Sequence, residues 1–306
     1  RVTMNALSVK NLNKSFGRQH VLVDVSFSLD RGEIIGFIGP NGSGKSTTMK
    51  CIANLIFPDS GEINIAGFNL SQSRNQALSH LSAMIEAPGL YYNLSGLDNL
   101  HLFAGLRGIS KKRVDEVIEF TGLSGALKKR ASAYSMGMKQ RLALGIAILT
   151  KPTVLILDEP FSGLDPHGAS ELRNLIKGLA AEGCGILFSS HEILEVEKTA
   201  QRNIFIKNGR VIIPERSKTR GSMQRYKLYL EPNGQVLPLL IKLTESALLE
   251  DFQQDEDTVI ITLTSPKHLS SVLKALLGNG QKIAGIIPLT SDIENLYNNI
   301  YQRDAL

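Results

Sequence analysis

The sequence predicts an α/β fold, and three patterns along the chain support this assignment. Continuous apolar runs at 34–38, 154–157 and 186–190 are typical of buried strands in a parallel sheet. The segment 23–29 alternates apolar and polar residues, which indicates a strand with one exposed face. Between 95 and 150 the apolar spacing becomes helical. We therefore expect central parallel strands, an antiparallel β subdomain and a helical subdomain.

The helical subdomain is expected to contain three helices. Ser95 and Asp98 have the spacing of a capping box, which predicts a helix beginning after Ser95. A second helix is expected to begin at Ser110 and to end at Gly122. The third places its apolar residues on one face and ends before Pro152.

A hairpin at 204–212, turning at Asn208-Gly209, is expected to close a first domain at 1–214. The polar, basic stretch 215–225 has no apolar period and is interpreted as a linker. Residues 226–306 then predict a small C-terminal α+β accessory domain.

In the accessory domain, strands are expected at 258–262 and 282–287, around a helix capped by Ser265-Pro266 and stopped by Gly278. A last helix is expected to begin at Ser291. This domain has no recognisable set of chemical groups. Its expected role is packing or dimer support, and a ligand-sensing role is the alternative.

A phosphate-binding loop (P-loop) follows the first apolar run. Its glycines let backbone N–H groups turn toward phosphates, Lys45 is placed to reach the β/γ oxygens, and Ser46 offers a hydroxyl to Mg²⁺. A strand before the loop and a helix after it are the context that this motif needs. The predicted nucleotide-binding residues of this segment are Gly39, Pro40, Asn41, Gly42, Ser43, Gly44, Lys45, Ser46 and Thr47.

Two carboxylates, Asp158 and Glu159, end the second apolar run. Phosphoryl transfer beside a P-loop needs a carboxylate for Mg²⁺ and a group that positions the attacking water. The sequence therefore predicts Asp158 as a metal ligand, acting through water, and Glu159 as the catalytic residue.

Two further sites are expected near phosphate. Ser135 and Gly137 lie where a helix begins, and a helix N-terminus offers free N–H groups and partial positive charge. His191 ends the third apolar run, and ligands of parallel sheets gather at the carboxyl ends of strands. His191 is therefore a candidate γ-phosphate sensor.

The ordered set of these motifs resembles the nucleotide-binding subunit of an ATP-binding cassette (ABC) transporter, over roughly residues 6–214. The motifs are 39–46, 135–140, 155–159, 162–165 and His191. The resemblance implies ATP and Mg²⁺ as cofactors and a head-to-tail dimer, in which Ser135 and Gly137 of one subunit complete the ATP site of the other. It also implies nucleotide-site positions for Asp165 and for Phe16, which by position resembles the aromatic residue that stacks on adenine.

Two positions depart from the family pattern. Met136 and Met138 replace residues of the common Leu-Ser-Gly-Gly-Gln signature, although the phosphate-facing Ser135 and Gly137 are kept. Glu86 stands where a glutamine usually faces the metal and the attacking water. A carboxylate there would bind Mg²⁺ more strongly, so Glu86 is predicted as a catalytic and metal-binding residue, with a neutral replacement as the alternative.

The stretches 85–91 and 94–100 are similar to ABC subunits of bacitracin exporters and lantibiotic-immunity transporters. This resemblance implies ATP hydrolysis that powers peptide-antibiotic export and confers immunity or resistance. Alternatives are an exporter of lipid or polysaccharide, a non-transport ABC ATPase acting on ribosomes or DNA, and a nucleotide-regulated scaffold without useful ATPase activity. Beside Glu86, the residues Pro88, Leu90, Tyr91 and Tyr92 could form an apolar groove for a helix of the membrane partner, or could pack in the core.

Composition fits a protein that acts with separate membrane subunits. The chain has 306 residues, 42% of them hydrophobic, and no apolar stretch approaches the roughly 20 residues that cross a bilayer. We expect integral-membrane permease subunits as partners and a cytoplasmic position on the inner face of the membrane. Two cysteines without metal-ligand spacing suit a reducing cytoplasm. The net charge of +5 is spread along the chain, so no nucleic-acid partner is expected.

Overall fold

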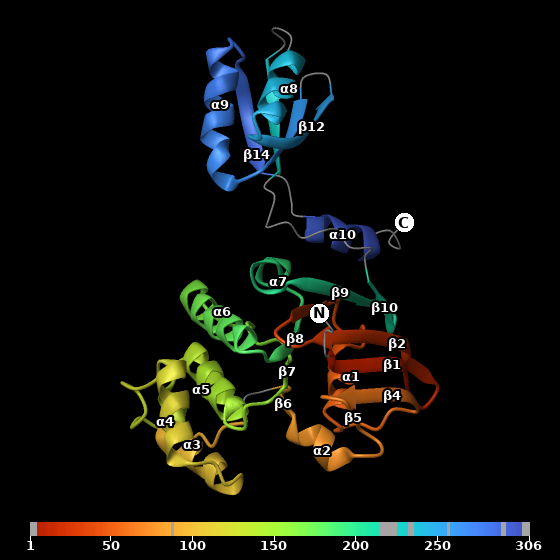
Figure 1. Cartoon of the computed structure of the whole chain (residues 1–306), viewed down its shortest axis with the longest axis vertical. Coiled ribbons are helices and arrows are strands. Elements are labelled where there is room, and N and C mark those ends of the chain that lie inside the picture. Colours follow the sequence, from red (N-terminus) through yellow and green to blue (C-terminus); the bar gives the residue numbers. More distant parts are fainter. Residues whose placement is uncertain are drawn as a thin grey trace. The chain divides into compact units, whose positions relative to one another are not determined.

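A computed structural model describes residues 5–86, 89–213, 225–231, 236–255, 258–288 and 292–301. The chain divides into two compact units, Arg1–Glu215 and Arg216–Leu306, each described by itself (Figure 1). Except for Arg225, the segment expected as a linker lies outside the described residues, as does Pro88.

The first unit is built on a six-stranded sheet that carries the expected apolar strands. Its central strands are parallel, and only β10 is antiparallel to its neighbour. Every residue of β3, β7 and β8 is buried, which explains why these segments are continuously apolar. In spatial order the strands are β10 (Arg210–Ile212), β9 (Arg202–Lys207), β3 (Ile34–Ile38), β8 (Gly185–Ser190), β7 (Val154–Leu157) and β6 (Leu81–Met84).

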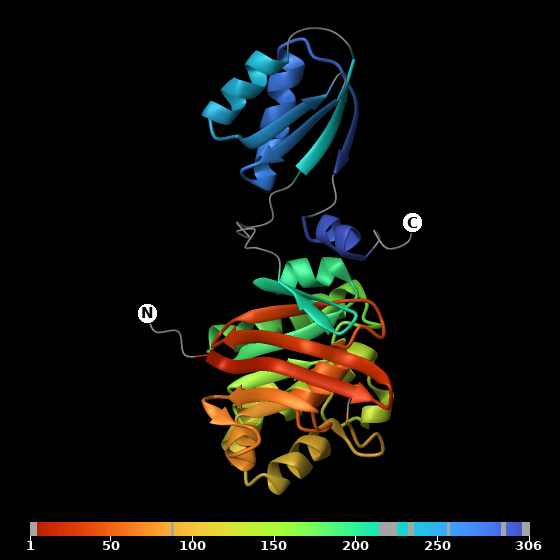
Figure 2. The same cartoon turned by 90° about the vertical axis from the view of Figure 1, so that its right-hand side faces the viewer.

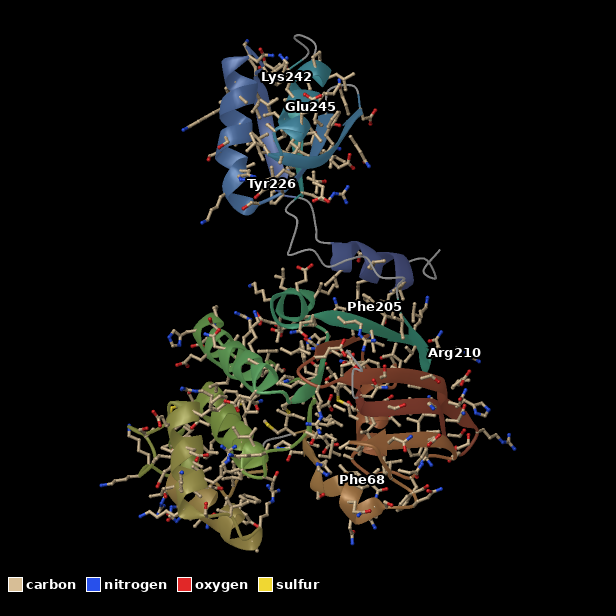
Figure 3. All side chains as sticks on the ribbon, viewed as in Figure 1. Phe68, Phe205, Arg210, Tyr226, Lys242 and Glu245 are labelled. Atoms are coloured by element: carbon tan, nitrogen blue, oxygen red, sulfur yellow. The ribbon has the colours of Figure 1, made fainter. Side chains whose placement is uncertain are left out.

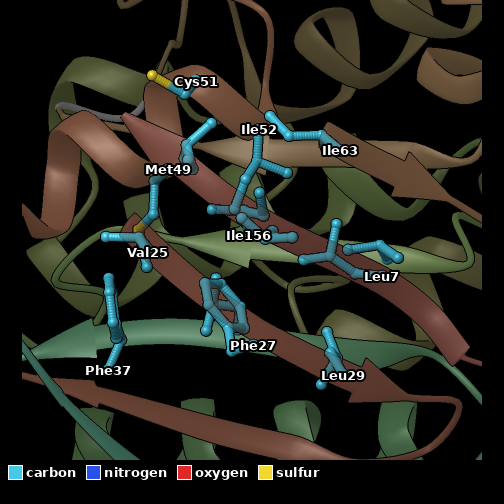
Figure 4. Packing of buried hydrophobic residues seen from close by; sticks show 14 of the residues in the cluster. Leu7, Val25, Phe27, Leu29, Phe37, Met49, Cys51, Ile52, Ile63 and Ile156 are labelled. Atoms are coloured by element: carbon cyan, nitrogen blue, oxygen red, sulfur yellow. The ribbon is translucent and has the colours of Figure 1, made fainter. Parts of the chain in front are cut away.

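A four-stranded antiparallel sheet lies beside it in the same unit (Figure 2). Phe27 of this sheet packs against Phe37 of β3 with ring centroids 5.8 Å apart. The shared core also contains Met49 and Ile52 from α1 (Figure 4). In spatial order its strands are β2 (Gln19–Asp30), β1 (Asn5–Phe16), β4 (Ser60–Ile65) and β5 (Phe68–Asn69).

The helix ends follow the sequence expectations closely. The Oγ atoms of Ser95 and Ser110 accept hydrogen bonds from Asp98 N at 3.0 Å and Arg113 N at 3.4 Å. The second of these helices ends at Gly122, with φ 64°. The helices of the unit are α1 (Lys45–Ile52), α2 (Arg74–Ser79), α3 (Gly96–Leu106), α4 (Lys111–Thr121), α5 (Met136–Ile148), α6 (Pro166–Ala181) and α7 (Ile193–Thr199).

The second unit has the element order β-α-β-β-α-β, followed by a last helix. Its antiparallel sheet has the order β12-β13-β11-β14, which is the ferredoxin-like arrangement. The expected strands and helices are present, whereas β11, β12 and α8 were not predicted. The elements are β11 (Arg225–Leu230), α8 (Leu237–Glu245), β12 (Leu249–Asp255), β13 (Thr258–Leu263), α9 (Leu269–Gly278), β14 (Ile283–Pro288) and α10 (Asp292–Tyr301).

Among the described residues, none of the helices combines the length and the hydrophobicity that a transmembrane span requires.

Candidate nucleotide-binding site

The loop between β3 and α1 has the backbone that phosphate binding needs. Gly42 and Gly44 have φ values of 80° and 113°, which turn successive N–H groups into one concavity. A Cβ atom on Gly39 would lie 2.6 Å from Ser43 Oγ and 2.7 Å from Ile206 O, so this position has no room for a side chain. No side chain caps α1, which leaves its first N–H groups available to an anion.

Lys45 is the first residue of α1, directly after this loop, and only 5% of its surface is exposed. Its Nζ donates hydrogen bonds to Gly39 O at 2.6 Å and Pro40 O at 3.2 Å. Burial lowers the pKa of Lys45, and the carboxylates of Glu159 and Asp158 oppose that shift. The lysine therefore places a desolvated positive charge at the loop.

The donors at this loop fit a nucleoside triphosphate. Ser43 Oγ is buried and has no hydrogen-bond partner among the described residues, so a hydroxyl is available beside the exposed N–H groups. Ser46 and Thr47 are half-buried in the first turn of α1, and Asp158 adds a carboxylate at the end of β7. Hydroxyl and carboxylate oxygens are suitable ligands for Mg²⁺, which commonly binds one or two carboxylates together with substrate phosphates.

Ser189 of β8, which the sequence did not single out, orients both carboxylate residues. Its Oγ donates to Asp158 Oδ1 at 2.6 Å and accepts from Glu159 N at 2.8 Å. Ser189 is fully buried. The φ of 49° at Glu159 is unusual for a residue with a side chain, so this hydrogen bond helps to hold a strained backbone.

The structure brings Lys45, Glu159 and His191 together. Glu159 Oε1 lies 3.8 Å from Lys45 Nζ, and Glu159 Oε2 lies 2.9 Å from His191 Nδ1. Half of the His191 side chain is exposed, so the imidazole lies where the cluster meets solvent. This arrangement joins a carboxylate that can align water to groups that can stabilise phosphate charge.

Glu86 lies just beyond β6, and Asp158 N donates to Met84 O of that strand at 2.8 Å. The Glu86 carboxylate receives a hydrogen bond from Lys50 Nζ at 2.6 Å, and this contact lowers the pKa of Glu86. Its backbone has a φ of 67°, in the left-handed region. Glu86 is therefore held by the last turn of α1, and Lys50 is a second residue that the sequence did not single out.

Ser135, Gly137 and Asp165 lie together in a separate groove of about 400 Å³, which Arg141 and Glu171 also line. Ser135 Oγ accepts from Met138 N at 3.3 Å, and Asp165 Oδ1 accepts from Gly168 N at 2.7 Å. A Cβ atom on Gly137 would lie 3.6 Å from Gly168 Cα. Two helix N-termini, those of α5 and α6, thus meet in this groove.

Phe16 ends β1 with half of its surface exposed, and Lys14 Nζ lies 5.4 Å from its ring centroid. A Cβ atom on Gly44 would lie 2.8 Å from Leu22 Cδ2, which shows that the β1–β2 hairpin runs beside the P-loop. Of the residues expected near a membrane partner, Leu90 is buried in the core, whereas Tyr91 and Tyr92 are 51% and 43% exposed.

Comparisons with known proteins agree with this geometry. Residues 22–162 match the family described as ABC transporter. The chain is 33% identical over 297 residues to the bacitracin transport ATP-binding protein BcrA of Enterococcus faecalis, and the match covers 96% of each chain. It is 39% identical over 207 residues to the lantibiotic transport ATP-binding protein SrtF of Streptococcus pyogenes, over 68% of this chain and 89% of SrtF.

Solved structures show the same fold for the cassette. The chain is similar to the ATP-binding subunit of an ABC transporter, with a TM-score of 0.61 and 35% identity, over 67% of this chain and 88% of that one. A nucleotide-free ATP-binding cassette gives a TM-score of 0.63 and 25% identity, over 68% and 90% of the two chains. The chain belongs to the ABC transporter family, as one of its ATP-binding, ATP-hydrolysing proteins.

Proposed function

We propose that this chain powers the export of a peptide antibiotic through separate membrane subunits. Two relatives support this proposal. The bacitracin transport ATP-binding protein BcrA is 33% identical to the chain, and the lantibiotic transport ATP-binding protein SrtF is 39% identical. The BcrA match extends over 96% of the chain and so includes most of the second unit, whereas the SrtF match extends over 68%. A bacitracin-like peptide is therefore the first candidate cargo, and a lantibiotic is the second.

The observation that carries the ATPase part of the proposal is the contact of Glu159 with both Lys45 and His191. In this proposal the P-loop N–H groups, Ser43 and Lys45 hold the triphosphate. Ser46 and Asp158 would hold Mg²⁺, which supplies charge neutralisation at the phosphates. Glu159 orients the attacking water, and His191 contacts the γ-phosphate.

The groove at the N-termini of α5 and α6 supports a head-to-tail dimer. Ser135 and Gly137 line it, and no P-loop residue does. A second copy would bring this phosphate-binding groove to the nucleotide held by the P-loop of the first. Each ATP would then lie between two subunits, and closure of the dimer would complete the site.

We place the protein on the cytoplasmic, inner face of the membrane, bound to permease subunits. Exposed Tyr91 and Tyr92 support a contact with a permease helix, because exposed aromatic side chains are frequent at protein interfaces. Tyr91 packs against Phe103 with centroids 6.0 Å apart, so its ring is oriented by α3.

Expression of the chain with its permease in a bacitracin-sensitive host tests the proposal. We expect raised resistance to bacitracin, and loss of that resistance in Glu159→Gln at equal protein level. Resistance to a lantibiotic but not to bacitracin would identify a lantibiotic as the cargo and would leave the rest of the proposal intact. Sensitivity equal to the empty host for both peptides would contradict peptide export and would favour a lipid or polysaccharide cargo.

Affinity capture of tagged protein from gently solubilised membranes tests the partner separately. A multi-span permease is the expected partner. Ribosomal or DNA-bound proteins without a permease would contradict the transporter assignment.

A further inference from the structure

Among the described residues of the second unit, helices cover one face of the sheet and leave the other face open (Figure 2). Residues of α8 and α9, including Leu240 and Leu276, pack against Leu228, Val259 and Ile261 of the sheet. Both helices lie on this covered face (Figures 1 and 2). Side chains alternate along a strand, so the residues between these core positions point to the other face.

Strand register gives the layout of the open face. Gln253, Ile260, Lys227 and Ile287 lie side by side across β12, β13, β11 and β14. On one side of this row is the row of Asp255, Thr258, Tyr229 and Gly285. On the other side Asp251 lies opposite Thr262, and Thr262 lies opposite Arg225 of β11. Tyr229 and Ile287 are 37% and 49% exposed. The face therefore mixes apolar side chains, among them Ile260 and Ile287, with charged side chains on β11 and β12.

Lys227, one of the positive residues of this face, is held in place by its neighbours. Lys227 Nζ lies 5.4 Å from the ring centroid of Tyr229. Gly285 opposes Tyr229, and a Cβ atom there would lie 3.6 Å from the tyrosine ring. The tyrosine ring thus lies beside β14, and the ring supports the lysine.

The two signs of charge occupy opposite sides of β13. Lys227 lies on β11, whereas Asp251 and Asp255 lie on β12. The carboxylates disfavour nucleic acid and anionic lipid, because both ligands are negatively charged along their surfaces. A surface that carries positive charge on one side and negative charge on the other instead suits a partner that presents negative charge to the first side and positive charge to the second.

We propose that this open face binds the same face of a second copy of the chain. A two-fold axis that runs along β13 exchanges β12 of one copy with β11 of the other. Lys227 then lies opposite Gln253 of the second copy, between its Asp251 and Asp255, and the contact occurs twice. Stacked sheets are separated by about 10 Å, a distance that side chains from both faces fill.

The same symmetry places Ile260 on the axis, against Ile260 of the second copy. An isologous interface is self-complementary, and the mirrored charges of β11 and β12 meet that condition. The contact uses no residue of the nucleotide site. Its failure would therefore leave the ATPase and the export proposals unaffected.

A cysteine on the axis tests the arrangement in the full chain. Ile260→Cys should be linked to its equivalent in the second copy by a short bis-maleimide, which spans thiols on sheets that are too far apart for a direct disulfide, whereas Lys242→Cys on α8, on the covered side (Figure 3), should not. The native thiols compete little, because burial raises the pKa of Cys51 to about 11 and of Cys184 to about 12. Equal cross-linking at 242 and 260, or none at 260, would overturn the proposal.

Charge reversal identifies the occupant as a second copy rather than another protein. Lys227→Glu alone, or Asp251→Lys with Asp255→Lys, should weaken self-association roughly tenfold in sedimentation without nucleotide, because like charges then face each other. A mixture of the two variants should restore the association by pairing one copy of each. The carboxylate introduced at position 227 of one copy would then face the introduced lysines of the other, and the native Lys227 would face the native carboxylates. Unchanged association of the single variants, or a mixture no tighter than either, would also overturn the proposal.

Discussion

The imidazole of His191 contacts the carboxylate of Glu159, with 2.9 Å between Nδ1 and Oε2. The other oxygen of the same carboxylate lies 3.8 Å from Lys45 Nζ. Glu159 is thus fixed from two sides, by a P-loop residue and by a residue that follows β8. This position supports the proposed role of Glu159 in aligning the attacking water.

We therefore expect Glu159→Gln to bind ATP and to hydrolyse it slowly. Loss of a group that positions and deprotonates water lowers turnover by roughly 10²–10⁴-fold. Phosphate release gives the rate, and equilibrium binding of a fluorescent ATP analogue gives the affinity. Turnover close to the unmodified protein would refute the role of Glu159, and loss of nucleotide binding would show that the residue holds the triphosphate.

Ser189→Ala tests the bridge between the two carboxylate residues. The change removes the acceptor of Glu159 N and the donor to Asp158 Oδ1, and it leaves a backbone N–H without its partner. We expect a loss of about 1–3 kcal/mol in the free energy of unfolding, with a lower kcat for ATP hydrolysis.

Ser190→Ala is the matched control on the same strand, because Ser190 Oγ accepts from Glu192 N instead. Its kcat should stay close to that of the unmodified protein. If Ser189→Ala folds and keeps full kcat, the positions of Asp158 and Glu159 do not depend on the bridge.

Lys50→Met tests whether Glu86 serves the metal. The pair is largely exposed on the Glu86 side, at 70%, so its loss should leave the free energy of unfolding nearly unchanged. Without Lys50, the Glu86 carboxylate has no cation holding it at α1. We expect half-maximal ATPase activity at a Mg²⁺ concentration up to roughly fivefold lower.

Glu86→Gln and the double variant complete this comparison. Glu86→Gln should raise the Mg²⁺ requirement, and adding Lys50→Met to it should produce no further change. Equal Mg²⁺ dependence in all four proteins would exclude a metal role for Glu86.

The strands of the first unit could be predicted because burial on both faces makes β3, β7 and β8 continuously apolar. The motif residues at their ends then meet at one edge of the sheet. Ser189 could not be singled out, because its function depends on the register that places Leu157 beside Phe188. Lys50 was missed because only the fold brings it to Glu86.

In the second unit, the strand β12 could not be predicted from the sequence for a different reason. The strand β12 reads Leu-Glu-Asp-Phe-Gln-Gln-Asp, and five of its seven residues are exposed. An edge strand with so few core contacts has no strong apolar alternation, so its pattern does not predict a strand. The buried residues of β13 alternate with half-buried ones, and that segment was predicted.

Gly36 of β3 has no room for a side chain, so we expect its replacement to lower the stability of the protein. A Cβ atom there would lie 2.4 Å from Val196 Cγ1 of α7, 2.9 Å from Asn203 Oδ1 and 3.2 Å from Ala200 Cβ. Gly36→Ala must therefore push α7 away from the sheet. We expect the free energy of unfolding, measured with urea, to fall by about 1–3 kcal/mol.

Gly105→Ala is the control for this change. Gly105 lies in α3, and a Cβ atom there would point into open space, so alanine should instead stabilise the helix by roughly 0.5–1 kcal/mol. Because α7 begins two residues after His191, the displacement in Gly36→Ala should also lower kcat, whereas Gly105→Ala should leave it unchanged. Equal urea midpoints for Gly36→Ala and the unmodified protein would show that α7 repacks on β3 without cost.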